Sequence, residues 1–144
     1  MSGWTLRAAE ACEPLIELLH QGIRSGPIIN MDETTVQALK EPGRKNNSES
    51  NMWAARSGPP KKPVVLFHYD PGRAGKVAER IVDAFQGFLQ TDGYAGYNAL
   101  GEREGVRHAG CLAHVRRKFH DVLQTGGEKK AGKAQTVVSR CKGG

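Results

Sequence analysis

Three short segments rich in β-branched and aromatic residues constrain the fold more than any other feature of this chain. They cover residues 28–36, 52–56 and 64–69, and a polar loop and a Ser-Gly-Pro-Pro turn separate them. Apolar runs of this length, bounded by Gly, Pro, Asn and Ser, favour strands joined in antiparallel order. The sequence therefore predicts that the fold begins as a three-stranded antiparallel meander.

The pattern after the third segment changes from strand to helix. Asp70-Pro71 offers an N-cap residue followed by a proline at the first helical position. Apolar side chains then recur at helical spacing, at Ala74, Ala78, Ile81, Val82 and Phe85. Residues 88–91 predict a fourth strand and residues 106–111 a fifth. This order predicts an α/β fold with a mixed five-stranded sheet and flanking helices.

Further helices are predicted on either side of these strands. Residues 5–23 have apolar side chains near a helical period, and Pro14 predicts a bend or the start of a second helix. Residues 94–100 predict one or two helical turns, and residues 112–123 predict a helix. Its expected inward-facing residues are Leu112, Val115, Phe119 and Val122. From Thr125 the chain is rich in Gly and Lys, and we expect it to fray.

These elements suggest three parts. We expect an N-terminal helical segment at residues 1–26, a core at residues 27–125, and a basic flexible tail at residues 126–144. No apolar run approaches the roughly 20 residues that span a bilayer, so we expect no membrane segment. Three cysteines without a C-x2-C pair favour free thiols in a reducing cytoplasm.

The positive charge of the chain is concentrated in its last third. The net charge is +6, but residues 1–102 hold 11 Lys/Arg against 12 Asp/Glu, and residues 103–144 hold 10 against 3. A local positive field favours a polyanion such as DNA, and a solvated basic tail is the alternative. The expected phosphate contacts are Arg116, Arg117 and Lys118, on the outer faces of the helix at residues 112–123.

Two aspartates stand in or next to predicted strands, Asp32 in the first and Asp92 after the fourth. If these strands are neighbours in the sheet, both carboxylates meet at one end of it. Mg²⁺ and Mn²⁺ take oxygen ligands, and two such ions can assist cleavage of a phosphodiester. The alternatives are a polar residue on a solvated strand face or a local cap for Asp32, and an Asp-Gly turn for Asp92.

A second set of candidate ligands lies near the fifth predicted strand. His108, Cys111, His114 and His120 have the spacing H-x2-C-x2-H-x5-H, which can bind Zn²⁺. The set crosses an expected strand-to-helix junction, and the alternative is a buried cysteine with histidines on a helix surface. Zinc therefore stays open beside the carboxylate site.

Several long blocks of the sequence resemble the catalytic region of bacterial DDE transposases, and most closely the insertion-sequence-sixty-six family. The similarity covers roughly residues 1–125. The blocks are Asn30-Met-Asp-Glu-Thr-Thr-Val-Gln, Glu41-Pro-Gly-Arg-Lys-Asn, Met52-Trp-Ala-Ala-Arg-Ser-Gly, Phe67-His-Tyr-Asp-Pro, Leu89-Gln-Thr-Asp-Gly-Tyr-Ala-Gly-Tyr-Asn and His114-Val-Arg-Arg-Lys-Phe-His-Asp.

The resemblance implies a ribonuclease-H-like fold and Mg²⁺- or Mn²⁺-dependent cleavage and strand transfer of double-stranded DNA in the bacterial cytoplasm. It implies that Asp32 and Asp92 are the first two acids of the catalytic and metal-binding triad. It also matches Cys111 and His114 to a C-x2-H signature that follows the second acid in several transposase groups.

The chain departs from the family pattern in one respect that bears on activity. The third acid, a glutamate on a later helix, has no matching position, and the similarity stops near Gly126. We therefore expect a C-terminally incomplete fold and a fragment that is inactive alone. The alternative is a non-catalytic DNA-binding or assembly module, stabilised by zinc. An exposed sheet edge or apolar face would favour a homodimer.

Overall fold

The computed structural model describes residues 3–59, 61–125 and 127–141. The chain divides into two compact units, which are residues 1–109 and residues 110–144. The elements of the first unit, in order, are α1 (Gly3–Arg24), β1 (Ile28–Gln37), β2 (Glu49–Ser57), β3 (Val64–Asp70), α2 (Gly75–Val82), β4 (Gly87–Thr91), the 3₁₀ turn η1 (Ala95–Tyr97), α3 (Asn98–Gly101) and β5 (Val106–Gly110). The second unit contains α4 (Leu112–Thr125) and α5 (Gly127–Arg140).

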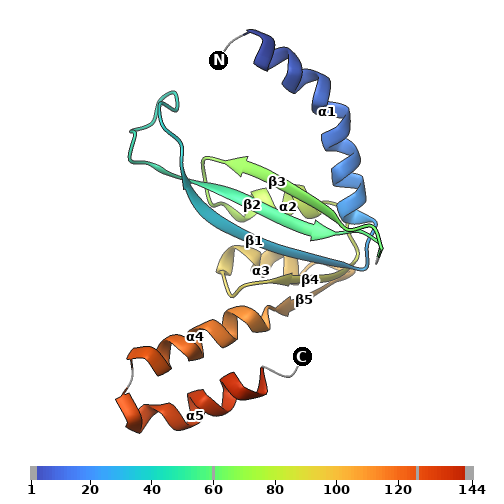
Figure 1. Cartoon of the computed structure of the whole chain (residues 1–144). Coiled ribbons are helices and arrows are strands. Elements are labelled where there is room, and N and C mark those ends of the chain that lie inside the picture. Colours follow the sequence, from blue (N-terminus) through green and yellow to red (C-terminus); the bar gives the residue numbers. More distant parts are fainter. Residues whose placement is uncertain (1–2, 60, 126, 142–144) are drawn as a thin grey trace. The chain divides into compact units, whose positions relative to one another are not determined.

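The five strands form one mixed sheet in the order β3-β2-β1-β4-β5 (Figure 1). β1 pairs with β2 antiparallel and with β4 parallel, and β2 pairs with β3 antiparallel. The expected α/β fold with a mixed five-stranded sheet is therefore confirmed. The crossover through α2 carries the chain from the β3 edge to the far side of β1, because a parallel strand needs such a connection.

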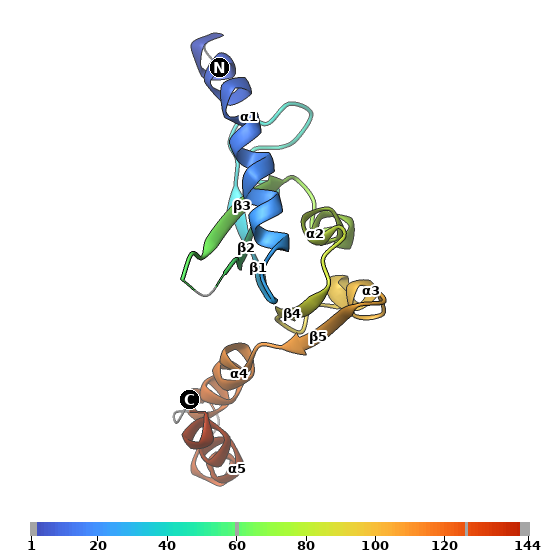
Figure 2. The same cartoon turned by 90° about the vertical axis from the view of Figure 1, so that its right-hand side faces the viewer.

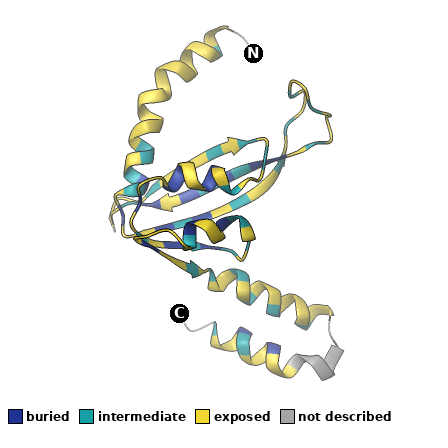
Figure 3. Ribbon diagram, turned by 180° about the vertical axis from the view of Figure 1, so that it is seen from behind, coloured by how far each residue is buried: buried dark blue, intermediate teal, exposed yellow. Residues whose placement is uncertain are grey.

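The hydrophobic core lies between the sheet and the helices on one of its faces. α2 and α3 lie on the same side of the sheet (Figure 2), and buried residues alternate with exposed residues along α2 (Figure 3). Period-two alternation in β1 buries Ile29 and Met31, while α2 buries Val77, Ala78, Ile81 and Val82. Trp53 and Leu89 complete the centre of the core, where both are fully buried.

The opposite face of the sheet is exposed within this unit. Alternate residues of the strands point to it, among them Ile28, Phe67 and Phe88. Asp32 shares this exposed face with Asn30, since both lie at alternate positions from the buried Ile29 and Met31.

Asp70 does not cap α2, contrary to the expectation from Asp70-Pro71. The helix begins at Gly75, with Ala74 at the N-cap position. The Asp70 carboxylate instead accepts the Gly72 N–H at 2.8 Å and pairs with Arg80 at 2.9 Å. The bond from the Gly72 N–H to Asp70 closes an Asx turn, and the helix starts only after it, at Gly75.

We expect Gly75→Ala to destabilise the first unit although alanine favours helices. A Cβ on Gly75 would overlap the backbone carbonyl oxygen of Gly96 in η1, and neither backbone can move aside cheaply. We expect a loss of about 1–3 kcal/mol in the free energy of unfolding, measured by urea denaturation. Gly93→Ala is the matched control, because a Cβ there meets no atom within 4 Å. Equal stability of the two variants would contradict the close packing of α2 on η1.

The second unit differs from the sequence-based expectation at both helices. α4 buries none of its residues, and its expected inward-facing Leu112 is 67 % exposed. α5 occupies residues for which the sequence predicts a fraying tail. The helical spacing of Ala134 and Val138 explains α5, because both side chains are buried where α4 and α5 pack together. The three expected domain boundaries stay predictions.

α1 continues through Pro14 as one helix. The proline removes one backbone hydrogen bond, to the carbonyl of Glu10, which lies on the exposed part of α1 where water can bind it. In the described part of the chain, no helix has the length and apolar character that crossing a membrane requires.

Candidate active site

The parallel pairing of β1 and β4 brings Asp32 and Asp92 to the same end of the sheet. The register pairs Ile28 with Phe88 and Asn30 with Gln90, an offset of sixty residues. Extended by two residues, this register sets Asp32 beside Asp92, the first residue after β4. Neighbouring strands lie about 4.8 Å apart. Asp32 and Asp92 therefore occupy adjacent positions, one on β1 and the other at the end of β4.

Alternation along both strands directs these two residues to the exposed face. Met31 and Thr91 are buried, with 3 % and 1 % of their surface exposed, and Asp32 and Asp92 follow them directly. Asp32 is exposed and Asp92 is half-buried. Both carboxylates therefore lie on the solvent side of the sheet.

Each aspartate also takes part in local backbone geometry. Asp32 Oδ1 accepts the backbone N–H of Glu33 at 3.1 Å, and Asp92 Oδ1 accepts that of Tyr94 at 2.9 Å. The Asp92 bond is the turn-forming role that the Asp-Gly pair suggested. The other Asp92 oxygen, Oδ2, makes no hydrogen bond to any described residue.

An ion pair between the buried Glu33 carboxylate and the half-exposed Arg73 guanidinium lies next to the two aspartates on the core side of β1. The side chain of Glu33 is only 2 % exposed. Its carboxylate accepts hydrogen bonds from Arg73 Nε at 2.8 Å, from the Arg73 Nη2 group and from the Tyr97 hydroxyl. A buried carboxylate is stable only when it is paired and hydrogen-bonded, and Glu33 meets both conditions.

Aromatic side chains hold the Glu33–Arg73 pair in place. The Arg73 guanidinium lies 4.0 Å from the centre of the Tyr94 ring, and the Tyr94 hydroxyl donates to the Arg73 carbonyl at 2.7 Å. The Tyr97 ring packs edge-on against Tyr94 and Trp53 at 5.8 and 6.0 Å. These contacts join β1, β2 and the segment after Asp92 into one rigid support.

Burial and the neighbouring carboxylates both act on the pKa of the Tyr97 hydroxyl. Burial raises the pKa of the Tyr97 hydroxyl well above its usual value, and the hydrogen bond to Glu33 raises it further. The negative charges of Glu33, Asp92 and Asp32 act in the same direction. The hydrogen bond to Glu33 also raises the pKa of Arg73. Tyr97 therefore remains a neutral donor and Arg73 a cation at any working pH.

A hydrogen bond across the sheet fixes the strand end that precedes Asp92. Thr91 Oγ1 lies 2.7 Å from His108 Nε2 on β5, and the Thr91 side chain is buried. The Thr91 hydroxyl also donates to the Asp92 carbonyl at 2.8 Å. β4 thus ends in a defined geometry beside β1.

Sequence reasoning missed Glu33, Arg73, Tyr97, Thr91 and His108 as parts of this site. One signal was available for Glu33. Period-two alternation in β1 turns a charged residue toward the core, and such a residue needs a cationic partner. Its partner Arg73 is forty residues away, in the turn before α2, and no local pattern identifies it.

Two adjacent carboxylates fit part of a site for Mg²⁺ or Mn²⁺. Their oxygens are the donors that these ions prefer, and Asp92 Oδ2 is available for coordination. Among the described residues, however, no group of three or more His, Cys, Asp or Glu side chains is arranged to hold a metal ion. The two aspartates therefore form part of a ligand set. The described residues do not form a complete set of ligands for either magnesium or zinc.

The other predicted residues lie in or next to the second unit. Cys111 precedes α4, and its carbonyl accepts the N–H groups of His114 and Val115 at 3.1 and 3.2 Å. Cys111 therefore stands at the start of the helix, and His114 in its first turn. Arg117 and Lys118 are exposed, and Arg116 is half-buried. Arg116 and Arg117 line a shallow hollow on α4 together with Ala113 and His120.

Comparison with known proteins gives a family match over almost the whole chain. The model of the Transposase IS66 family matches residues 1–142. Two curated proteins of Sinorhizobium fredii (strain NBRC 101917 / NGR234) are also similar. Uncharacterized protein y4jD is 37 % identical over 139 residues, and Uncharacterized protein y4qI is 31 % identical over 138.

These similarities cover 89 % and 88 % of this chain but only 27 % and 25 % of the two relatives. The chain thus spans about a quarter of the length of the curated relatives that it matches. Among solved structures, a chain of the simian T-cell lymphotropic virus intasome in complex with PP2A regulatory subunit B56 gamma matches with a TM-score of 0.43. The two chains share 11 % identity, and the match covers 81 % of this chain and 48 % of that one.

Proposed function

The chain belongs to the Transposase IS66 family, and we propose on this basis that Asp32 and Asp92 are two carboxylates of a metal-dependent site for DNA strand cleavage and transfer. The observation that carries the proposal is the parallel register of β1 and β4, which gives these residues adjacent positions on an exposed face. Since the chain covers a quarter of its relatives' length, the activity of the whole protein is part of the proposal.

In this proposal Asp32 and Asp92 hold Mg²⁺ or Mn²⁺. A bound ion would activate the attacking oxygen and stabilise the leaving oxygen of a phosphodiester. The family resemblance implies a third acid, a glutamate, and no residue of this sequence matches it. Because this acid is missing, we expect the chain to be inactive alone as a transposase, with no more than weak metal binding and residual metal-dependent nicking.

The chain's own residues supply rigidity and phosphate contacts. Glu33, Arg73 and Tyr97 fix β1 behind Asp32, and the Thr91–His108 bond fixes β4 before Asp92. Preorganised carboxylates need no rearrangement when substrate binds, which lowers the barrier to reaction. The basic residues of α4 would hold DNA phosphates without reading sequence.

The basic face of α4 gives a prediction about DNA binding. We expect the affinity for duplex DNA to fall steeply with salt, because phosphate contacts release counterions. The double variant Arg116→Glu/Arg117→Glu should weaken binding at least tenfold and reduce the slope of log K against log[salt] by about 2. Fluorescence anisotropy over a salt series measures both quantities. An unchanged slope would remove α4 from the DNA interface.

The experiment that tests the function asks whether the purified chain binds Mn²⁺ and nicks DNA, or instead contains zinc. We expect binding of Mn²⁺ and nicking of supercoiled plasmid DNA that depends on Mn²⁺ or Mg²⁺. Metal analysis runs in parallel. Stoichiometric zinc that is lost in Cys111→Ala, without Mn²⁺ binding or nicking, would instead support a zinc-stabilised DNA-binding or assembly module. A bacterial cytoplasmic location and a homodimer stay predictions.

A further inference from the structure

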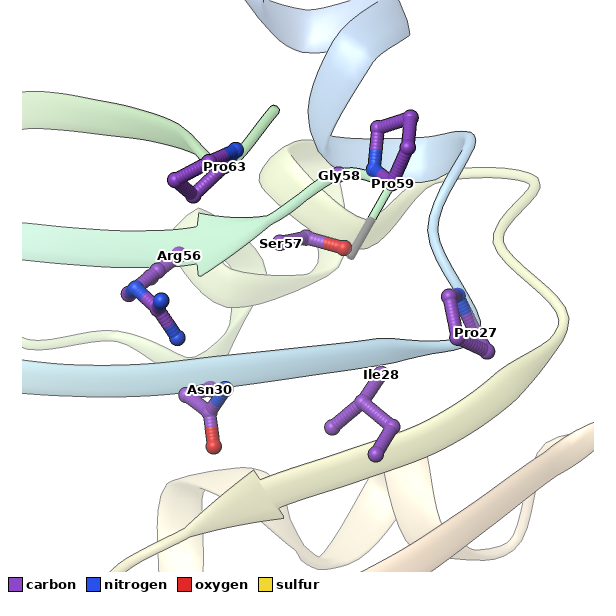
Figure 4. Close-up of a pocket in the computed structure, with 8 residues that line it drawn as sticks. All are labelled: Pro27, Ile28, Asn30, Arg56, Ser57, Gly58, Pro59 and Pro63. Atoms are coloured by element: carbon purple, nitrogen blue, oxygen red, sulfur yellow. The ribbon is translucent and has the colours of Figure 1, made fainter. Parts of the chain in front are cut away.

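A pocket of about 240 Å³ opens where β1 and β2 part at one end of the sheet. The last pair between these strands is Asn30 with Arg56. Beyond it, β1 pairs only with β4, and Ser57 of β2 pairs with Val64 of β3. Figure 4 shows the lining residues, which are Pro27, Ile28, Asn30, Arg56, Ser57, Gly58, Pro59 and Pro63.

The pocket combines a cation with polar side chains that lack partners. Within the described chain, the exposed Arg56 guanidinium makes no hydrogen bond or ion pair. The Asn30 amide lies opposite it in the register. Ser57 is only 7 % exposed, yet its Oγ has no hydrogen-bond partner. Because this hydroxyl is enclosed by the protein, the polar side chains at the mouth of the pocket are those of Arg56 and Asn30.

The chemistry of these groups selects an anion. Among the described residues no acidic side chain lines the pocket, and the turn that contributes Pro59 and Pro63 also contains Lys61 and Lys62. A guanidinium presents a planar fork of donors that matches a phosphate in two-point contact. The Asn30 amide adds a neutral donor, and Pro27, Pro59 and Pro63 line the pocket beside it.

The pocket lies next to the carboxylate pair on the same strand. Asn30 and Asp32 are two residues apart on β1 and share its exposed face, a separation of about 6.6 Å along the strand. A phosphate bound by Arg56 and Asn30 would therefore lie about 6.6 Å from Asp32 along β1.

We propose that the pocket binds a backbone phosphate of duplex DNA. On the DNA strand, this phosphate is the neighbour of the one that meets Asp32 and Asp92. Arg56 supplies the charge and the two-point contact, while the Asn30 amide fixes the orientation of the phosphate. This inference rests on the proposed function, because it takes the DNA to lie across the exposed face of β1.

Arg56→Gln tests the proposal, since it removes the charge and keeps most of the side-chain length. We expect duplex DNA affinity to fall about tenfold and the salt slope to decrease by about 1. Arg56→Lys should restore the slope but only part of the affinity, because it lacks the planar fork. Arg103→Gln is the control, as Arg103 is exposed in the same unit and outside the pocket.

A second measurement locates the ligand directly. Inorganic phosphate titrated into the ¹⁵N-labelled chain should shift the amide signals of Asn30, Ser57 and Gly58, and Arg56→Gln should abolish these shifts. Thermal unfolding of each variant shows whether it remains folded.

The outcomes separate this proposal from the proposed function. Equal DNA affinity and salt slope in Arg56→Gln and Arg103→Gln, with wild-type binding intact, would overturn the pocket's role and leave the carboxylate site standing. Absence of any salt-dependent DNA binding by the wild-type chain would overturn the proposed function, and the phosphate role of the pocket with it.

Discussion

Asp92→Asn should lower metal-dependent nicking of DNA by at least about a hundredfold. The substitution keeps the side-chain size and the oxygen that accepts the Tyr94 N–H. It removes the negative charge and replaces the second carboxylate oxygen with an amide group, which cannot coordinate a cation. A metal ion contributes several kcal/mol to such a reaction, and each 1.36 kcal/mol is a factor of ten in rate.

The same variant should bind Mn²⁺ at least tenfold more weakly, and Asp32→Asn should match it in both measurements. Binding of Mn²⁺ is followed by electron paramagnetic resonance, and nicking by conversion of supercoiled plasmid to open circles. Glu104→Gln is the control, because Glu104 is an exposed carboxylate of the same unit without an ion-pair partner among the described residues. Its affinity and activity should equal those of the wild type.

Two results would count against the paired carboxylates. Mn²⁺ affinity that is lost in Asp32→Asn but intact in Asp92→Asn would show that the two residues do not share an ion. Nicking that persists in both variants would come from another site or from a contaminating nuclease. Circular dichroism of each variant shows that loss of activity does not arise from loss of fold.

The strands were accessible from sequence because their signals are local. β-branched segments bounded by Gly, Pro and Asn predicted β1, β2 and β3, and the helix after Asp70 implied that the next strand runs parallel. That β1 and β4 are neighbours follows from the sheet order β3-β2-β1-β4-β5, which confirms the expected mixed sheet.

What the sequence could not supply depends on contacts between distant residues. Glu33 and Arg73 are forty positions apart, and Thr91 and His108 seventeen. The start of α2 was misplaced because Asp70 pairs with Arg80, an alternative to capping that a local pattern does not reveal. α5 was missed because helix propensity is low across its glycines, and packing of Ala134 and Val138 outweighs it.

The largest stability effect is expected at Glu33, whose carboxylate is the acceptor for both Arg73 and Tyr97. Glu33→Gln keeps the volume but removes the charge, and its amide group places a donor against another donor. Hydrogen bonds to a charged group contribute about 1.5–3 kcal/mol each, and loss of a buried partner leaves the other unpaired. Because the Arg73 side chain is 49 % exposed, water compensates part of this loss, and we expect about 2–3 kcal/mol.

Urea denaturation measures this loss, with Glu104→Gln expected within about 0.5 kcal/mol of wild type. Tyr97→Phe removes one donor only and should cost about 1 kcal/mol. Mn²⁺ binding, measured under conditions in which the variant is folded, then shows whether Glu33 supports β1 or is itself a metal ligand. If Glu33 holds β1 in place, folded Glu33→Gln retains Mn²⁺ affinity within a few-fold, whereas a loss equal to that of Asp92→Asn would make Glu33 a ligand. Stability equal to that of Glu104→Gln would refute the structural role, because a carboxylate buried to this degree cannot lose its charge without a change in the free energy of unfolding.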